Sequence, residues 1–277
     1  MTSGRYRVRC ALTGMFRLDG GAMFGSVPKT LWHKRAPADE ENRIELATRS
    51  LLIEDTESTR RILVDVGNGT KFDAVGVERF AIDSLDPAKW NVDADTLTDV
   101  VITHLHFDHA GGITKHESDG RVGLTFPEAE IVLQRENLDN ARAPTAKEGG
   151  SYLPENVDPL SSAKLRLVDG AGEIFPEINV RVFHGHTRGL QAVIVGTGPG
   201  AIAYPSDLVP MSHHLGLPWI MGYDRCAETT LEEKRGFLDE AVSERWVVVF
   251  EHDPAIAAAT LKKDHRGRVV IDDVVEL

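Results

Sequence analysis

Two kinds of short segment recur along the whole chain. In one kind hydrophobic and polar positions alternate, and the other kind is wholly apolar. Segments of this kind, bounded by Gly, Pro, Asn and Asp, predict β-strands. The polar run D-T-E-S-T at residues 55–59 separates two of them and predicts a strand pair. The predicted strands cover residues 5–12, 44–54, 61–66, 100–102, 129–133, 165–168, 180–183, 192–195, 201–203, 246–250 and 268–275.

Hydrophobic residues at helical spacing predict a smaller number of helices. The clearest helix covers residues 229–242, where the apolar side chains fall on one side. Residues 143–163 are rich in Pro, Gly, Ser and Glu, and they predict a long surface excursion that contributes to a pocket wall. Strands in two blocks, each followed by helices, predict an α/β fold built of packed layers. Shorter helices are predicted over residues 71–80, 93–100 and 134–142.

Residues 16–32 are unusual because the segment is rich in glycine and yet strongly apolar. Its three glycines and its proline predict a loop, which also carries Met23, Phe24 and Trp32. An apolar loop either packs onto the body of a protein or lines a pocket. These three side chains are therefore candidate substrate contacts, and simple packing is the alternative.

The composition limits the function. Of 277 residues, 42% are hydrophobic and 27% are charged, as in globular proteins, and the net charge is −12. An acidic protein repels phosphate backbones, so no nucleic-acid partner is expected. No stretch approaches the roughly 20 apolar residues of a membrane span, and no apolar signal region opens the chain. With only Cys10 and Cys226 as cysteines, these features predict a soluble cytoplasmic protein without a membrane partner.

Residues 100–112, V-V-I-T-H-L-H-F-D-H-A-G-G, join an apolar strand to four side chains that can bind metal ions. Residues two apart on an extended segment point to the same side, so His104 and His106 can hold one ion together. Asp108 and His109 follow where the chain turns into a helix, and they can face a second ion. A lone histidine is usually an ordinary surface or core residue, but four ligands at this spacing favour a metal site.

The pattern H-x-H-x-D-H resembles the signature of the metallo-β-lactamase superfamily. The resemblance implies a four-layer αββα sandwich in which residues 1–277 form a single domain. It also implies three later ligands, each just past an apolar strand. They are His186 in F-H-G-H-T-R-G, Asp207 in A-Y-P-S-D-L and His252 in V-F-E-H-D-P. His186 is preferred to His184 because it matches the family motif G-H-T-x-G.

The implied site holds two divalent metal ions. Five imidazoles and two carboxylates suit Zn²⁺, with Mn, Fe and Co as alternatives. Relatives with a diiron redox centre carry Glu where this chain has His106, which favours hydrolysis. The resemblance implies that a metal-bridging hydroxide attacks the substrate and that Asp108 is the catalytic residue that later protonates the leaving group. The implied ligands are His104, His106 and His186 for the first ion, Asp108, His109 and His252 for the second, and Asp207 bridging both.

Further residues are candidates for support or for substrate binding. Asp65 ends an apolar strand in L-V-D-V-G-N-G, where the superfamily has an Asp, and is expected to hydrogen-bond a metal-binding histidine. A turn-forming Asp is the alternative. Lactonases of the superfamily place a tyrosine a few residues after the bridging Asp, whereas Asp207 is followed by L-V-P. Tyr223, His213 or His214 could take that place, and for the two histidines an ordinary loop position is the alternative.

Within the superfamily the chain looks most like the N-acyl homoserine lactonase-like and phosphotriesterase-like hydrolases. This implies a metal-dependent hydrolase of a hydrophobic lactone or ester, with a small-molecule substrate and, as is frequent in those lactonases, a homodimeric assembly. Organophosphate triesters and aryl esters are the alternative substrates. An alternative of another class is a protein that keeps the metals but only binds or senses a small molecule. The complete set of ligands argues against it.

Overall fold

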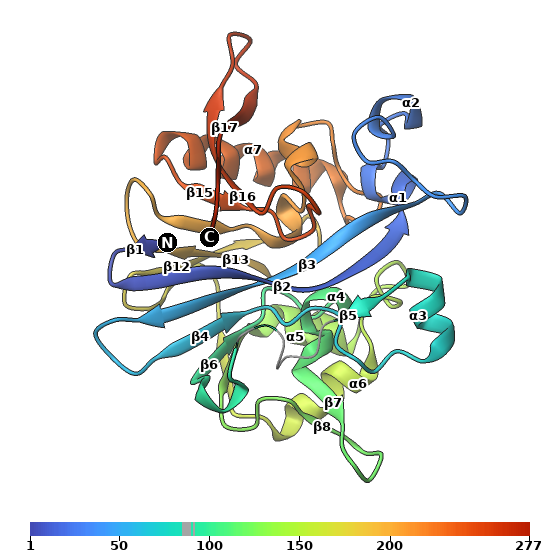
Figure 1. The fold of residues 1–277 in the computed structure, drawn as a ribbon, viewed down its shortest axis with the longest axis vertical. Coiled ribbons are helices and arrows are strands. Elements are labelled where there is room, and N and C mark those ends of the chain that lie inside the picture. Colours follow the sequence, from blue (N-terminus) through green and yellow to red (C-terminus); the bar gives the residue numbers. More distant parts are fainter. Residues whose placement is uncertain (85–89, 91) are drawn as a thin grey trace.

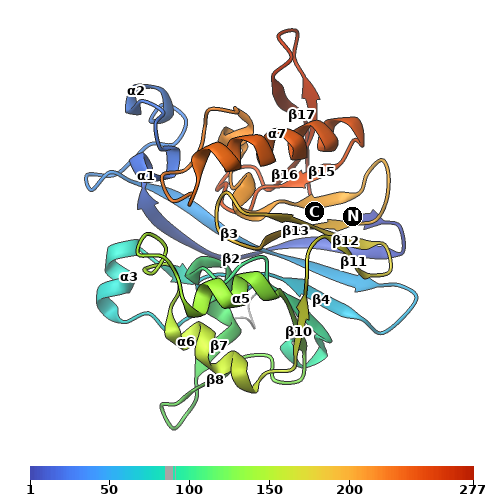
Figure 2. The ribbon, with the colours of Figure 1, turned by 180° about the vertical axis from the view of Figure 1, so that it is seen from behind.

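Two β-sheets packed face to face form the centre of the protein, and helices cover both outer faces (Figure 1). The computed structural model describes residues 1–84, 90 and 92–277. Helix α7 (Ala227–Ser243) covers one sheet, whereas α5 (Arg135–Arg142) lies on the outer side of the other. The view from behind shows the same order of layers (Figure 2). The predicted four-layer αββα sandwich is confirmed.

The first sheet joins an antiparallel part to a parallel part. Across the sheet the strands are β1 (Thr2–Ser3), β2 (Tyr6–Asp19), β3 (Arg43–Asp55), β4 (Arg61–Val64), β6 (Asp99–Val101), β9 (Glu130–Gln134) and β10 (Leu165–Val168), and β5 (Asp83–Ser84) pairs with β2. Strands β1 to β4 pair antiparallel, and β4, β6, β9 and β10 pair parallel. The carboxyl ends of β4 and β6 therefore meet at one edge, where Asp65 and the histidine-rich segment emerge.

The second sheet carries its strands in sequence order. They are β11 (Gly172–Phe175), β12 (Ile178–Phe183), β13 (Leu190–Val195), β14 (Ile202–Tyr204), β15 (Val247–Val249), β16 (Ala258–Lys263) and β17 (Val269–Val275). Neighbours are antiparallel except β14 and β15, whose parallel pairing requires a crossover that contains α7. The chain leaves β12, β14 and β15 close to His186, Asp207 and His252.

The remaining elements are short. The helices are α1 (Gly20–Phe24), α2 (Lys29–Trp32), α3 (Ala74–Phe80), α4 (Phe107–Ala110) and α6 (Pro154–Val157), and β7 (Thr114–His116) pairs with β8 (Val122–Leu124). The 3-10 helices are η2 (Ala94–Thr96), η3 (Gly111–Ile113), η4 (Asp158–Ser162), η5 (Ser206–Leu208) and η6 (Ser212–Leu215). Among the helices of the described residues, none is long and apolar enough to cross a membrane.

The central strands β4, β6 and β9 of the first sheet are buried on both faces, which explains their uninterrupted apolar runs. In β6, Val100 packs in the cluster that contains Leu138 of α5, whereas Val101 packs against the second sheet with residues such as Val193. Successive side chains of a strand point to opposite faces, so one short strand contributes to two cores. A third core lies between the second sheet and α7, where Phe237 is buried.

One local prediction is wrong, and another is confirmed only in part, because the short capped helix before β6 is a 3-10 turn. The predicted loop of residues 16–32 contains the end of β2 and the helices α1 and α2, and the Asp19 carboxylate caps α1 by accepting from the Ala22 amide. Residues 93–100 form only the 3-10 helix η2 before β6 begins. Pairing of β6 with residues 62–64 of β4 ends the helical turn, because tertiary pairing overrides local helix propensity.

Candidate metal centre

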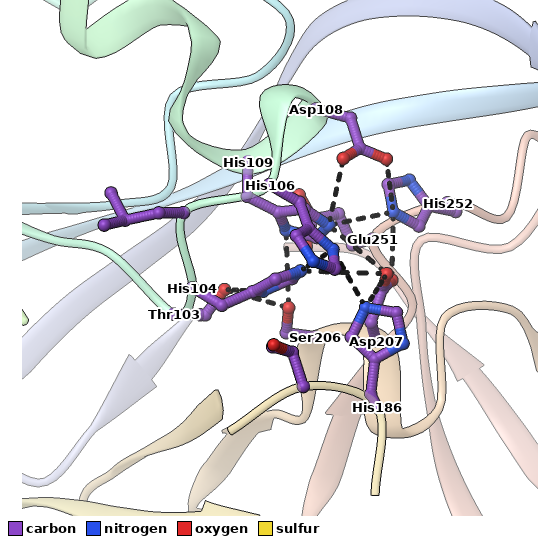
Figure 3. Close-up of polar contacts among 12 residues, drawn as sticks. Thr103, His104, His106, Asp108, His109, His186, Ser206, Asp207, Glu251 and His252 are labelled. Atoms are coloured by element: carbon purple, nitrogen blue, oxygen red, sulfur yellow. Dashed lines mark hydrogen bonds and ion pairs between the residues drawn. The ribbon is translucent and has the colours of Figure 1, made fainter. Parts of the chain in front are cut away.

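The chain passes from β6 into α4 through the histidine-rich segment, as Figure 3 shows. His106 is the last residue before α4, and Asp108 and His109 lie in its first turn. An added side chain on Gly111 would collide with the backbone of Asn68, which follows β4. The glycine therefore allows the helix end to approach the neighbouring strand end closely. The predicted change from an extended segment to a helix at this point is confirmed.

One group of side chains in the site consists of three histidines and one aspartate. The His104 Nε2 and the His186 Nε2 atoms each lie 3.1 Å from His106 Nδ1. The Asp207 carboxylate approaches the same point, with Oδ2 3.1 Å from His186 Nε2. All four side chains are buried, and each offers an atom within 4.8 Å of the others. This group contains the predicted ligands of the first ion.

A second group lies beside the first. It contains Asp108, His109 and His252, whose ligand atoms also lie within 4.8 Å of one another. The two Nε2 atoms of His109 and His252 are 3.3 Å apart, and Asp108 Oδ2 is 3.7 Å from His252 Nε2. Asp207 also reaches this group, because its Oδ1 lies 3.1 Å from His252 Nε2 and its Oδ2 lies 3.5 Å from His109 Nε2. Asp207 thus touches both groups.

The donor atoms of both groups fit divalent metal ions. A neutral imidazole has one donor and one acceptor, so converging ring nitrogens cannot all be paired with one another by hydrogen bonds. The buried Asp207 Oδ1 atom, 3.1 Å from His252 Nε2, has no partner that meets hydrogen-bond geometry among the described residues. Imidazole nitrogens and carboxylate oxygens that converge in this way are the ligands that Zn²⁺ and related ions take.

The proton affinities of the site reflect this crowding of imidazoles and carboxylates. Burial, and then the neighbouring imidazoles, hold the pKa of His104 and of His106 well below the usual range. Burial also disfavours the charged forms of His186 and His252, but the Asp207 carboxylate outweighs it and raises their pKa values to about 10 and about 9. Burial acts to raise the pKa of Asp207, yet the surrounding imidazoles, led by His186, hold it well below its usual range. A cation bound by these groups replaces the protons.

A buried polar network lies beneath the second group. The Asp65 carboxylate accepts hydrogen bonds from the Thr103 amide at 2.8 Å and from the Thr103 hydroxyl at 2.7 Å. The same carboxylate lies 3.1 Å from His109 Nδ1. The Thr103 hydroxyl also pairs with that of Ser206 at 2.9 Å. Asp65 and Ser206 have φ angles of 54° and 51°, a left-handed backbone that costs non-glycine residues energy and is often retained at functional sites.

Hydrogen bonds on Nδ1 orient two further histidines of the site. The Asp224 carboxylate lies 2.9 Å from His186 Nδ1, and the Ala47 carbonyl lies 2.8 Å from His252 Nδ1. Each acceptor fixes the proton on Nδ1 and leaves Nε2 free to bind a cation. The ring orientation of both histidines therefore follows from contacts outside the metal-binding motifs.

The supporting residues apart from Asp65 were not found by sequence reasoning. Thr103 is adjacent to His104, and Glu251, adjacent to His252, places Oε2 3.0 Å from His109 Nδ1. A charged residue such as Glu251 at the end of an apolar strand was a usable signal. Asp224 gives no such signal, because it lies in an irregular segment 38 residues from His186. The roles of all predicted site residues as ligands or substrate contacts stay predictions.

A cavity of about 220 Å³ opens beside the two groups. Its walls combine site residues with apolar side chains from the N-terminal segment, α3, α4 and the segment before α7. Ser151 also belongs to the wall, as predicted for the excursion of residues 143–163. The lining residues are Leu18, Met23, Leu46, Phe80, His106, Phe107, Asp108, Ser151, His186, Asp207, Met221, Tyr223 and His252.

The predicted substrate contacts divide into two sets. Met23 and Tyr223 line the cavity, whereas Phe24, Trp32, His213 and His214 are absent from its described lining. Phe24 and Trp32 are fully buried in a hydrophobic cluster formed largely by the N-terminal segment, and their ring centroids are 5.4 Å apart. His214 stacks on Phe24 and lies 3.0 Å from the Met23 carbonyl through Nε2. Packing thus accounts for Phe24, Trp32 and His214.

Comparisons of sequence with known proteins identify one superfamily and relatives of different functions. A family model described as the metallo-beta-lactamase superfamily matches residues 43–252. An N-acyl homoserine lactonase from Bacillus sp is 26% identical over 157 residues, which are 56% of this chain and 55% of that protein. The transcription termination factor FttA of Methanocaldococcus jannaschii is 26% identical over 234 residues, 80% of this chain and 34% of that protein. The chain thus spans about half of the lactonase and a third of the termination factor.

Solved structures agree with the sequence comparison. A probable metal-dependent hydrolase from Staphylococcus aureus has a TM-score of 0.87 and 26% identity, and the match covers 99% of this chain and 100% of that chain. AidC, a dizinc quorum-quenching lactonase solved with a homoserine product, has a TM-score of 0.76 and 18% identity, covering 100% of this chain and 97% of that chain. The second likeness shows the shared fold alone.

Proposed function

Because the chain belongs to the metallo-beta-lactamase superfamily, whose members are usually metal-binding hydrolases, we propose that it hydrolyses a neutral, hydrophobic lactone or related ester at a dinuclear centre. The observation that carries the proposal is the convergence of seven buried His and Asp side chains at the wall of a largely apolar cavity, whose described lining contains no Lys or Arg. Zn²⁺ is the proposed metal. The proposed ligands are His104, His106, Asp108, His109, His186, Asp207 and His252.

The proposed site residues have separate roles in hydrolysis. When bound, two divalent ions supply Lewis acidity and a water molecule whose pKa is lowered toward neutrality. Asp207 contacts both groups of ligands, so it would hold both ions. Asp108 belongs to the second group and also lines the cavity, where its carboxylate can accept the proton that the attacking water gives up and pass it to the leaving group. The buried histidines keep their orientation through their Nδ1 contacts.

The lining of the cavity favours a neutral substrate. Among the residues described as lining it, none is Lys or Arg, and two are aspartates. The two ions would bind the one group that reacts, but the remaining charges of a substrate with several carboxylates or phosphates would find no Lys or Arg among the described lining and would be repelled by Asp108. Leu18, Leu46, Met221 and the other apolar side chains offer contacts to a hydrocarbon chain instead. The lactonase relative, at 26% identity, supports a lactone as the first substrate to test. The acidic composition argues against nucleic acid.

Tyr223 is the proposed donor to the substrate carbonyl. It lines the cavity, and burial raises its pKa above the usual value, so its hydroxyl keeps its proton at neutral and alkaline pH. Tyr223→Phe is expected to lower kcat/KM on the order of 10²-fold, the effect of losing one donor to a developing oxyanion. Tyr6→Phe removes a buried hydroxyl that donates to Pro176 far from the site, and should leave kcat/KM unchanged. Equal rates for wild type and Tyr223→Phe would remove Tyr223 from the mechanism.

Proton release tests the proposed function directly. Metal-loaded protein is mixed, in weak buffer, with an N-acyl homoserine lactone, an aryl ester and a phosphotriester in turn. We expect acid from the lactone, loss of acid production after chelation, and recovery when Zn²⁺ is restored. Fastest turnover of the phosphotriester or aryl ester would change the substrate class. Tight retention of the lactone without turnover of any of the three would instead identify a binding or sensing protein.

A further inference from the structure

The two nitrogens of the His109 ring face different surroundings. Its Nε2 faces the second group of proposed ligands, 3.3 Å from His252 Nε2 and 3.8 Å from Asp108 Oδ1. Its Nδ1 faces two buried carboxylates, with Asp65 Oδ2 at 3.1 Å and Glu251 Oε2 at 3.0 Å. Figure 3 shows both Glu251 and His252 beside the His109 ring. Two consecutive residues of the chain therefore contact opposite ends of one imidazole.

The two carboxylates differ in what else they bind. Asp65 accepts two hydrogen bonds from Thr103, so its charge is compensated without His109. Glu251 is 1% exposed, and neither of its oxygens has a hydrogen-bond partner among the described residues. The nearby Tyr204 hydroxyl donates instead to the Arg49 carbonyl at 2.6 Å. The Glu251 carboxylate is thus left with the His109 ring as its close ionic contact.

A buried carboxylate whose charge has so few partners lowers the stability of the fold. Neighbouring donors do not reduce the cost, because the Arg49 guanidinium is engaged by the main-chain carbonyls of Phe250, Glu251 and Asp253. The position of Glu251 is useful only through His109, since a carboxylate on Nδ1 fixes the ring and makes Nε2 a stronger ligand. The contact is therefore better explained by a role at the metal centre than by stability.

We propose that Glu251 is a positioning residue of the second metal ion, which holds the Nδ1 end of His109 so that Nε2 faces Asp108 and His252. The inference rests on the second ion of the proposed function. Asp65 orients the same ring from the end of β4, and Glu251 adds a second negative charge from the end of β15. The first ion, whose proposed ligands are three other histidines, does not depend on Glu251.

Stepwise metal titration tests the role of Glu251. Glu251→Gln keeps the size of the side chain and removes its charge, and metal-free protein is titrated with Co²⁺ or Zn²⁺ against a competing chelator. We expect the affinity for the second equivalent to fall about 10–100-fold, the range for losing a partner of a metal-binding histidine. The affinity for the first equivalent should stay within about threefold of wild type. Asp55→Asn, which breaks a partly buried ion pair with Arg5 away from the site, should lower the Tm but leave both equivalents bound.

The outcomes separate this inference from the proposed function. If Glu251→Gln binds both equivalents as wild type does, the positioning role is wrong and the dinuclear hydrolase stands. If it loses both equivalents together with a fall in Tm like that of Asp55→Asn, Glu251 is a structural residue and the inference is again overturned. If the wild type itself binds fewer than two equivalents, both the inference and the dinuclear centre fail.

Discussion

Replacing Asp207 with alanine is expected to abolish hydrolysis almost completely, with kcat/KM falling about 10³-fold or more. The Asp207 carboxylate contacts imidazoles of both groups of proposed ligands, through Oδ2 at 3.1 Å from His186 Nε2 and Oδ1 at 3.1 Å from His252 Nε2. Without it, five imidazoles remain around the two ions with only one carboxylate, that of Asp108. Two divalent cations in a buried site then lose both their common ligand and half of the negative charge that offsets them.

The measurement is kcat/KM on the preferred neutral ester together with bound metal per chain. Asp207→Asn keeps an oxygen ligand and removes the charge, so it should retain more metal than the alanine variant while remaining strongly impaired. Asp169→Ala is the matched control, because its carboxylate is 68% exposed and pairs with Arg135 on the surface. If Asp207→Ala keeps two ions and a rate within about tenfold of wild type, the bridging role is wrong.

The local part of the site was the most predictable from sequence. His104, His106, Asp108 and His109 lie within six positions after β6, so their proximity follows from the geometry of a strand that enters a helix. No contact across the fold is needed to bring them together. The apolar runs of the strands predicted the layers for a similar reason, because buried strands and an amphipathic helix leave a clear pattern in the sequence.

The later ligands could not be chosen from spacing alone. His184 and His186 both follow β12, and only the resemblance to a family motif favoured His186. The structure shows why they differ, since His184 is 43% exposed and lies 3.4 Å from Glu136 on the surface, whereas His186 is buried against Asp224. Whether a strand-end histidine faces the site depends on partners far away in the sequence, which local patterns do not encode.

The N-terminal segment shows a second limit of sequence reasoning. Its apolar residues were equally compatible with packing and with a pocket wall, and the structure contains both. Met23 lines the cavity, whereas Phe24 and Trp32 pack beneath it against His214 and its neighbours. Side chains one residue apart on a short helix point in different directions, so hydrophobicity alone could not separate these roles.

Arg49 gives the largest expected effect on stability, because it connects the two sheets beneath the site. Its side chain extends from β3 and is bound by three main-chain carbonyls of the segment that carries His252, those of Phe250 and Glu251, both at 3.2 Å, and that of Asp253. Arg49 is only 8% exposed, so water cannot replace the guanidinium fully. Arg49→Met leaves buried carbonyls without their donor, at about 1–3 kcal/mol each.

We therefore expect Arg49→Met to lower the free energy of unfolding by about 3–5 kcal/mol, measured by urea denaturation of metal-free protein. Arg49→Lys should lose less, because all three contacts come from the single nitrogen Nη1, and an ammonium group can still reach some of the carbonyls. Arg17→Met is the matched control, since that arginine is 34% exposed and its ion pairs with Asp39 and Glu45 are long, at 3.6 and 3.7 Å. Such pairs contribute at most about 1 kcal/mol. If Arg49→Met lowers the free energy of unfolding no more than Arg17→Met does, the pairing of β15 with β16 alone holds the segment around His252. The charge of Arg49 then has no structural role.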